Sequence, residues 1–215
     1  MEEGADSTGR AAEIDLRPPA DADPQAVATA RAELETFRAE CQEQYMVFAL
    51  NVELRGHIPT SRRWQFLWDS ERADVLLSVG TGPPASEYVP GGRTFAAMRQ
   101  GKFLDAVSKG GDFGCRDANA FVVFVYSLRE HRCRRKLARL FDVEDNAVNC
   151  VLMGDIRYVR HAILHTAWKL PERYRSNLKI LPLLWGEIPE GELRISADMV
   201  TELMKQINAL RVEIQ

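Results

Sequence analysis

Apolar residues recur every three or four positions along most of this chain of 215 residues, and that spacing restricts the fold to packed α-helices. The clearest example starts at Pro24, because proline suits the first turn of a helix. Gly56 and Pro59 are expected to end it. Its apolar positions are Val27, Ala30, Leu34, Phe37, Cys41, Tyr45, Phe48 and Val52. The sequence therefore predicts one long amphipathic helix from residue 24 to about residue 54.

The same spacing predicts four more helices. They are expected over residues 60–79, 117–140, 147–168 and 196–210. Asp117 and Ser196 stand where side-chain oxygens can cap the third and the last of the five. A short extended piece is expected at 193–195, just before the last helix. Because each helix must bury its apolar face against a neighbour, the predicted fold class is all-α, an antiparallel helical bundle.

Composition divides the chain into three kinds of segment. Residues 1–23 are acidic and rich in alanine, proline and glycine, so we expect a disordered tail. Residues 24–215 are expected to form a single domain, which is long enough to bury a hydrophobic core. Within it, residues 80–114 are rich in glycine and proline and predict a long irregular insertion, with short helical patterns at 95–98 and 103–107.

Charge and cysteine usage exclude several classes of protein. The net charge of −3 gives no overall attraction for nucleic acid, so any RNA contact needs a local basic patch. The four cysteines contain no Cys-x-x-Cys pair, which is typical of reduced cytoplasmic thiols and argues against a zinc site. The N-terminus lacks the features of a signal peptide, and the apolar run at 121–126 is too short to span a bilayer. We therefore expect a cytoplasmic protein that has no membrane segment, metal or cofactor.

The helix predicted at 147–168 carries the side chains that could take part in a chemical reaction. At about 100° per residue, its core stripe falls within roughly 80°. That stripe consists of Val148, Leu152, Ile156, Val159 and Ile163. The opposite side carries Arg157, Arg160, His161, Leu164, His165 and Trp168. Because Leu164 and Trp168 are apolar and face away from the core, we expect them to meet a second copy of the chain; the alternative is an isolated helix on which Trp168 lies along the surface.

Part of this helix resembles the motif helix of the HEPN superfamily of helical-bundle ribonucleases. Arg160-His161-x3-His165 is similar to the family's pattern of arginine, a polar residue, three variable residues and histidine. Gly154-Asp155 precedes it, and Tyr126-x3-Glu130 on the helix before is similar to a pattern found upstream in several bacterial families. The resemblance covers residues 117–210. It implies a HEPN-like bundle that cleaves RNA without a metal, at a cleft where two protomers place their motif helices face to face.

The resemblance implies catalytic roles that are chemically coherent. Attack by a ribose 2′-OH on its neighbouring phosphate needs a base and an acid, and histidine can be either near neutral pH. We assign proton transfer to His165 and stabilisation of the phosphorane to Arg160, with His161 orienting substrate or partner groups. Glu130 and Arg157 are expected to support this set.

RNA is expected to bind near Arg134 and Arg135, which belong to a basic run from Arg132 to Arg139. Structural interpretations stand beside these assignments. A basic run is usually a solvated face, and each histidine could be paired with a backbone carbonyl or a carboxylate. Glu130 could equally be a structural partner of Arg134.

Three functions are compatible with these features. The first is a homodimeric endoribonuclease of toxin or phage-defence type, held in check by an antitoxin or inhibitor protein. The second is a non-catalytic HEPN-like module that binds RNA, a nucleotide or a protein. The third is a helical interaction protein in which the motif match is accidental.

Overall fold

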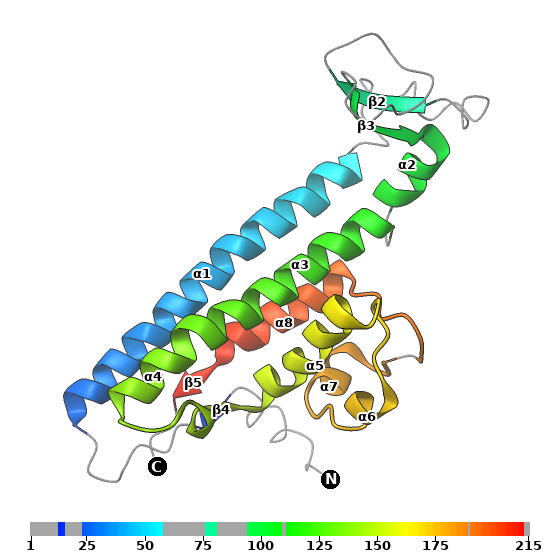
Figure 1. Ribbon diagram of the computed structural model, residues 1–215. Helices are drawn as coiled ribbons and strands as arrows, with labels where there is room; N and C mark the ends of the chain where they lie inside the picture. Colours follow the sequence, from blue (N-terminus) through cyan, green and yellow to red (C-terminus); the bar gives the residue numbers. More distant parts are fainter. Residues whose placement is uncertain are drawn as a thin grey trace, which may run out of the picture. The chain divides into compact units, whose positions relative to one another are not determined.

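The computed structural model describes residues 13–15, 23–57, 76–80, 94–108, 111–188 and 190–212. Most of these residues are helical, as the sequence predicted, and the strands are short (Figure 1). The chain divides into two compact units, the first made of Met1–Phe48 with Asp117–Gln215 and the second of Ala49–Arg116. The single domain expected over 24–215 stays a prediction.

The first unit is built on three long helical segments that run side by side (Figure 1). The first is α1 (Pro24–His57) up to Phe48. The second is α3 (Asp112–Leu128) from Asp117 on, which continues through a π-helical turn, η4 (Arg129–Cys133), into α4 (Arg134–Leu140). α8 (Ala197–Ala209) is the third segment.

Pairs of contacts fix the directions of these segments. Glu33 on α1 pairs with Lys136 and Glu40 with Arg132, so α1 is antiparallel to the α3–α4 segment. Gln42 bonds Asn208 and Tyr45 bonds Thr201, so α1 is antiparallel to α8 as well.

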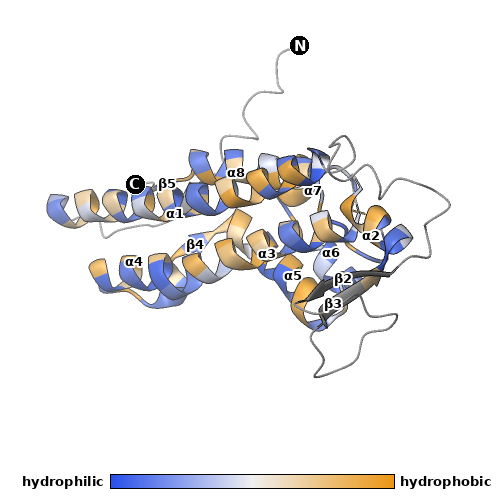
Figure 2. Ribbon diagram, turned by 90° about the horizontal axis from the view of Figure 1, so that it is seen from above, coloured by the Kyte–Doolittle hydropathy of each residue, from blue (hydrophilic) through white to orange (hydrophobic). Residues whose placement is uncertain are grey.

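The core lies between these helices and follows the predicted spacing. Figure 2 shows that each helix carries both hydrophilic and hydrophobic residues. On α1 the predicted apolar face is buried at Ala30, Leu34, Phe37, Cys41 and Phe48. On α8 the buried side chains are Val200, Leu203, Met204 and Ile207. Removing this apolar surface from water is the main force that holds the unit together.

The π turn η4 changes which residues face the core. The backbone N–H of Arg134 bonds the carbonyl of Arg129, a spacing of five residues instead of four. As a result Arg129 is buried, with 7% of its surface exposed, while Leu128, which the helical spacing assigns to the core, is only half-buried. The predicted helix over 117–140 is thus found, but it begins earlier, at Asp112, and contains this irregularity.

A small sheet fixes the start of the motif helix. Strand β1 (Glu13–Asp15) pairs antiparallel with β4 (Asn149–Cys150) and parallel with β5 (Arg211–Val212). The predicted disordered tail over 1–23 was therefore wrong for these three residues. β4 leads directly into α5 (Val151–His165), which carries the motif. A 3-10 turn, η5 (Asp145–Ala147), precedes the strand, so α5 starts later than the predicted residue 147.

α5 also ends earlier than predicted. Ala167 and Trp168 have φ angles of 48° and 65°, so the chain turns out of the helix through the left-handed region. The N–H of Trp168 bonds the carbonyl of Ala162 at 3.0 Å, which satisfies a terminal carbonyl of the helix. Trp168 is therefore half-buried beyond the helix rather than on its outward face beside Leu164. The sequence could not predict this ending, because a left-handed helix end is usually marked by glycine and neither residue is a glycine.

One carboxylate on α5 holds the segment that follows this helix. α6 (Glu172–Arg175) and α7 (Leu181–Trp185) follow in turn. Asp155 on α5, which is 2% exposed, accepts hydrogen bonds from the backbone N–H groups of Lys179, Ile180 and Leu181, at 2.7 to 3.1 Å. This side chain therefore ties α7 to the motif helix.

The approach to α8 agrees only in part with prediction. Instead of a regular strand at 193–195, a single antiparallel bridge joins Lys169 and Glu192, next to a bond of 2.7 Å from the N–H of Leu193 to the carbonyl of Trp168. Ser196 caps α8 as predicted, since its Oγ accepts the N–H of Met199 at 3.2 Å.

The second unit contains more regular structure than expected. β2 (Leu76–Gly80) and β3 (Thr94–Arg99) form an antiparallel pair, and α2 (Gln100–Val107) follows. The irregular insertion predicted at 80–114 was thus wrong for 94–107, where only the helical pattern at 103–107 is confirmed. The helix predicted over 60–79 was wrong for 76–79, which belong to strand β2. Its residues 60–75 lie outside the described residues.

Candidate functional site

The two motif histidines lie together on α5. They are four residues apart and so occupy the same face one turn apart, and their ring centroids are 4.9 Å from each other. His161 is half-buried, and its ring centroid also lies 5.2 Å from that of Tyr174, with the two ring planes 81° apart. His165 is exposed at the end of the helix. The pair is therefore held on one side by an aromatic ring and open to a ligand at His165.

Arg160 points toward α3 instead of toward the histidines. Its guanidinium carbon lies over the Tyr126 ring, 5.3 Å from the centroid, a cation–π contact. Its Nε is buried and has no hydrogen-bond partner, and no described carboxylate pairs with its guanidinium. A buried donor without a partner is costly, so an acceptor that reached this Nε would be bound favourably.

Tyr126 lies among several charged groups. Burial raises the pKa of its phenol, and the carboxylate of Glu130 raises it further, against the opposing effect of Arg157, Arg129 and Arg160. The phenol therefore stays protonated across the physiological range and can donate a hydrogen bond.

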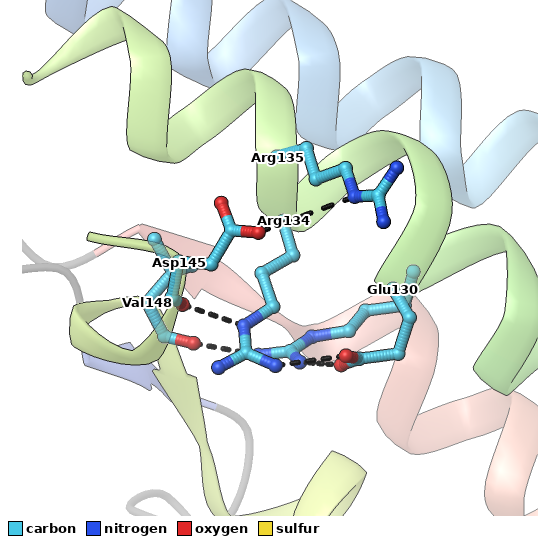
Figure 3. A network of polar contacts seen from close by, with 6 residues as sticks. Glu130, Arg134, Arg135, Asp145 and Val148 are labelled. Carbon is cyan, nitrogen blue, oxygen red and sulfur yellow. Dashed lines mark hydrogen bonds and ion pairs between the residues drawn. The ribbon is translucent and has the colours of Figure 1, made fainter. Parts of the chain in front are cut away.

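Glu130 belongs to a network with two arginines (Figure 3). It pairs with Arg129, and its second oxygen accepts Nη1 of Arg134 at 2.8 Å. Burial pushes the pKa of Glu130 upward, but the charges and hydrogen bonds of Arg129 and Arg134 outweigh it and hold the pKa below its usual value. Arg129 also bonds the carbonyl of Val148 at 2.7 Å, so the network anchors the chain just before α5. Glu130 is therefore a structural partner of Arg134, and among the described residues it makes no contact with His165.

The basic run expected to bind RNA is largely neutralised. Arg134 bonds both Glu130 and the carbonyl of Asp145, and Arg135 lies 4.0 Å from the Asp145 carboxylate (Figure 3). The neighbours Arg132 and Lys136 pair with carboxylates of α1. Arginines already paired with carboxylates are poor phosphate ligands, because the pair must first be broken.

An aromatic stack next to the histidines was missed by the sequence analysis. Tyr158 of α5 and Tyr174 of α6 stack with centroids 4.9 Å apart and ring planes 22° apart. Arg157 lies over the Tyr158 ring at 5.0 Å, and Arg173 lies over the Tyr174 ring at 4.8 Å. The only sequence signal is the repeated Arg-Tyr dipeptide, and nothing in that signal shows that the two copies meet.

The two apolar residues expected at a dimer interface, Leu164 and Trp168, lie in different surroundings. Leu164 is exposed on α5, with 47% of its surface accessible, beside His165. Trp168 lies beyond the helix, as described above. Leu164 is therefore the apolar residue that α5 presents beside the candidate site.

No group of three or more histidine, cysteine, aspartate or glutamate side chains in the described ranges is placed to hold a metal ion. Within the same ranges, no helix has the length and apolar character needed to cross a membrane.

Comparison of the chain with models of known protein families, with curated proteins and with solved structures finds no match. The case for a function therefore rests on the side chains of this site.

Proposed function

We propose that this protein is a HEPN-like endoribonuclease that cleaves RNA by 2′-OH attack and needs no metal for the chemical step. The observation that carries the proposal is the His161–His165 pair on the helix that also presents Arg160, whose buried Nε has no partner. Two groups that can exchange a proton stand one helical turn apart, and the same helix carries a cation with unused hydrogen-bonding capacity. These are the groups that transesterification of a phosphodiester requires.

The proposed reaction has two coupled proton transfers. A histidine, His165 in our assignment, takes the proton of the ribose 2′-OH as the 2′-oxygen forms a bond to phosphorus. The bond from phosphorus to the 5′-oxygen then breaks, and a protonated imidazole gives its proton to that oxygen. Arg160 offsets the negative charge that the phosphorane gains. The products are a 2′,3′-cyclic phosphate and a free 5′-hydroxyl.

The proposal includes a homodimer in which two motif helices meet. His165 and Leu164 are neighbouring exposed residues, so a second copy that covers Leu164 would bring its own histidines close to this site. Arg160 and His165 lie roughly 140° apart around the helix. They therefore flank the outward face instead of sharing a line along it, which suits a site assembled across a two-fold axis. A toxin or phage-defence role in the cytoplasm, controlled by an antitoxin or inhibitor protein, is part of the proposal.

The test is RNA cleavage by purified protein in excess EDTA. Wild type is expected to cut single-stranded RNA to products with a 2′,3′-cyclic phosphate, and His165→Ala to be slower by roughly a hundred- to ten-thousand-fold. His131→Ala is the matched control, because His131 is an exposed histidine on η4, outside the motif. RNA that carries 2′-O-methyl at the scissile position should resist.

Two results would count against this function. If His165→Ala and Arg160→Ala both cleave like wild type, these residues are not the catalytic groups. If wild type binds RNA but never cleaves it, the non-catalytic binding module becomes the better description, and the partnerless Arg160 Nε is then an anion-binding group only.

A further inference from the structure

The Tyr158–Tyr174 stack holds two guanidinium groups in place. The arginine that precedes each tyrosine in sequence lies over that tyrosine's ring. Each arginine also donates a hydrogen bond from Nη2 to the phenol oxygen of the same tyrosine, at 3.3 Å. A guanidinium that lies on an aromatic ring keeps the N–H groups along its edge free for hydrogen bonds. The stack therefore orients Arg157 and Arg173 while leaving their remaining N–H donors available.

These two arginines differ from most of the basic run. Both are exposed, and neither pairs with a carboxylate among the residues that the structure describes. In the basic run, by contrast, Arg132, Arg134, Arg135 and Lys136 all have carboxylate partners. Positive charge with unused donors is therefore found around the aromatic stack.

The stack is also in contact with the candidate catalytic residues. The Tyr174 ring lies 5.2 Å from the His161 ring, which is 4.9 Å from the His165 ring. An anion bound by Arg157 or Arg173 would consequently sit within a short distance of the histidine pair. A polyanion with regularly spaced charges would bridge the two places.

We propose that Arg157 and Arg173, positioned by Tyr158 and Tyr174, form a clamp for backbone phosphates of single-stranded RNA next to the cleavage site. This inference rests on the proposed ribonuclease function for the identity of the ligand. Guanidinium groups bind phosphate oxygens bidentately, which fixes the strand without reading its bases. The clamp would hold the strand so that a neighbouring phosphate lies at the histidine pair.

The experiment measures binding and cleavage separately. Binding is followed by fluorescence anisotropy with a labelled, fully 2′-O-methylated oligoribonucleotide, which the protein cannot cut by 2′-OH attack, over a series of salt concentrations. The test variant is Arg157→Gln with Arg173→Gln. The control is Arg31→Gln with Arg116→Gln, which removes the same charge from two exposed arginines outside both the stack and the basic run.

We expect the test variant to lose two phosphate contacts. The slope of log affinity against log salt should shrink by about 1.4, because each contact to a single strand contributes about 0.7. Its dissociation constant at low salt should rise about tenfold or more. The control should keep the wild-type slope. Tyr174→Leu, which removes one platform but keeps both charges, should weaken binding toward the level of the test variant, whereas Tyr174→Phe should not.

The outcomes separate the clamp from the catalytic proposal. If wild type cleaves RNA and the test variant keeps the wild-type slope, the clamp is wrong and the ribonuclease stands. If wild type does not cleave but the test variant alone loses binding, the clamp stands and the ribonuclease fails. Equal losses in the test and control variants, or no binding of the oligonucleotide by wild type, would overturn the clamp.

Discussion

Asp155 offers the sharpest test of how the motif helix is held. Its carboxylate is almost fully buried and accepts three backbone N–H groups, two of which belong to the buried residues Ile180 and Leu181. Asp155→Ala would leave those two donors without a partner, while the N–H of Lys179, an exposed residue, can turn to water. An unsatisfied buried donor costs about 1–3 kcal/mol, so we expect a loss of roughly 2–6 kcal/mol.

A loss of this size is large beside the roughly 5–15 kcal/mol that usually stabilises a domain. Asp155→Asn should lose less, about 1–3 kcal/mol, because the amide keeps one acceptor but turns an NH2 group toward the N–H donors. Urea unfolding followed by circular dichroism measures both losses. Asp142→Asn is the control, because Asp142 is an exposed aspartate at a positive φ that asparagine also tolerates.

An Asp155→Ala variant that lost no more stability than the control would contradict this expectation. That result would mean that the segment around α7 does not depend on this carboxylate, and that residues 179–181 find other acceptors. If Asp155→Asn proved as damaging as Asp155→Ala, the negative charge would matter more than the acceptor count.

Three further predictions concern the dimer, the end of α5 and the Glu130 network. Leu164→Glu should give folded monomers in sedimentation at micromolar concentration, and a wild type that is already monomeric there would remove the composite site. Ala167→Gly should raise the free energy of unfolding by about 1 kcal/mol, since glycine adopts a φ of 48° without the penalty of a Cβ; an unchanged melting temperature would contradict this. Because the folded pKa of Glu130 is lowered, its contribution to stability is present above the unfolded value of about 4.5 and is lost as the pH falls through the folded value. Glu130→Gln should therefore cost most near pH 7 and progressively less below pH 4.5, and a cost independent of pH would show that the ion pairs do not stabilise the fold.

Local sequence was sufficient to place a helix where apolar residues recur with helical spacing along the whole segment. The spacing of apolar residues after Pro24 placed α1 and its buried face, and Ser196 marked the start of α8. The neighbouring positions of His161 and His165 also followed from sequence alone, because residues four apart share one face of any helix. These features need no knowledge of what the helix packs against.

The surroundings of the site depended on residues far apart in the chain. Burial of Arg129 follows from a π turn, and Glu130 is drawn to two arginines instead of to His165. Ala167 and Trp168 adopt positive φ angles after α5, so Trp168 does not lie on the helix face. Neither residue is a glycine, so no signal in the sequence marks this turn.

Tertiary structure alone placed the partners of the motif helix. The stack of Tyr158 on Tyr174 and the bonds from Asp155 to residues 179–181 join positions 16 to 26 residues apart. Periodicity reports only which side of a helix is apolar, whereas such pairings are decided by how the connecting segments fold back. The sequence by itself therefore determined α1, α3, α5, α8 and the histidine pair, and the packing of α6 and α7 against α5 decided which charges around that pair remain available.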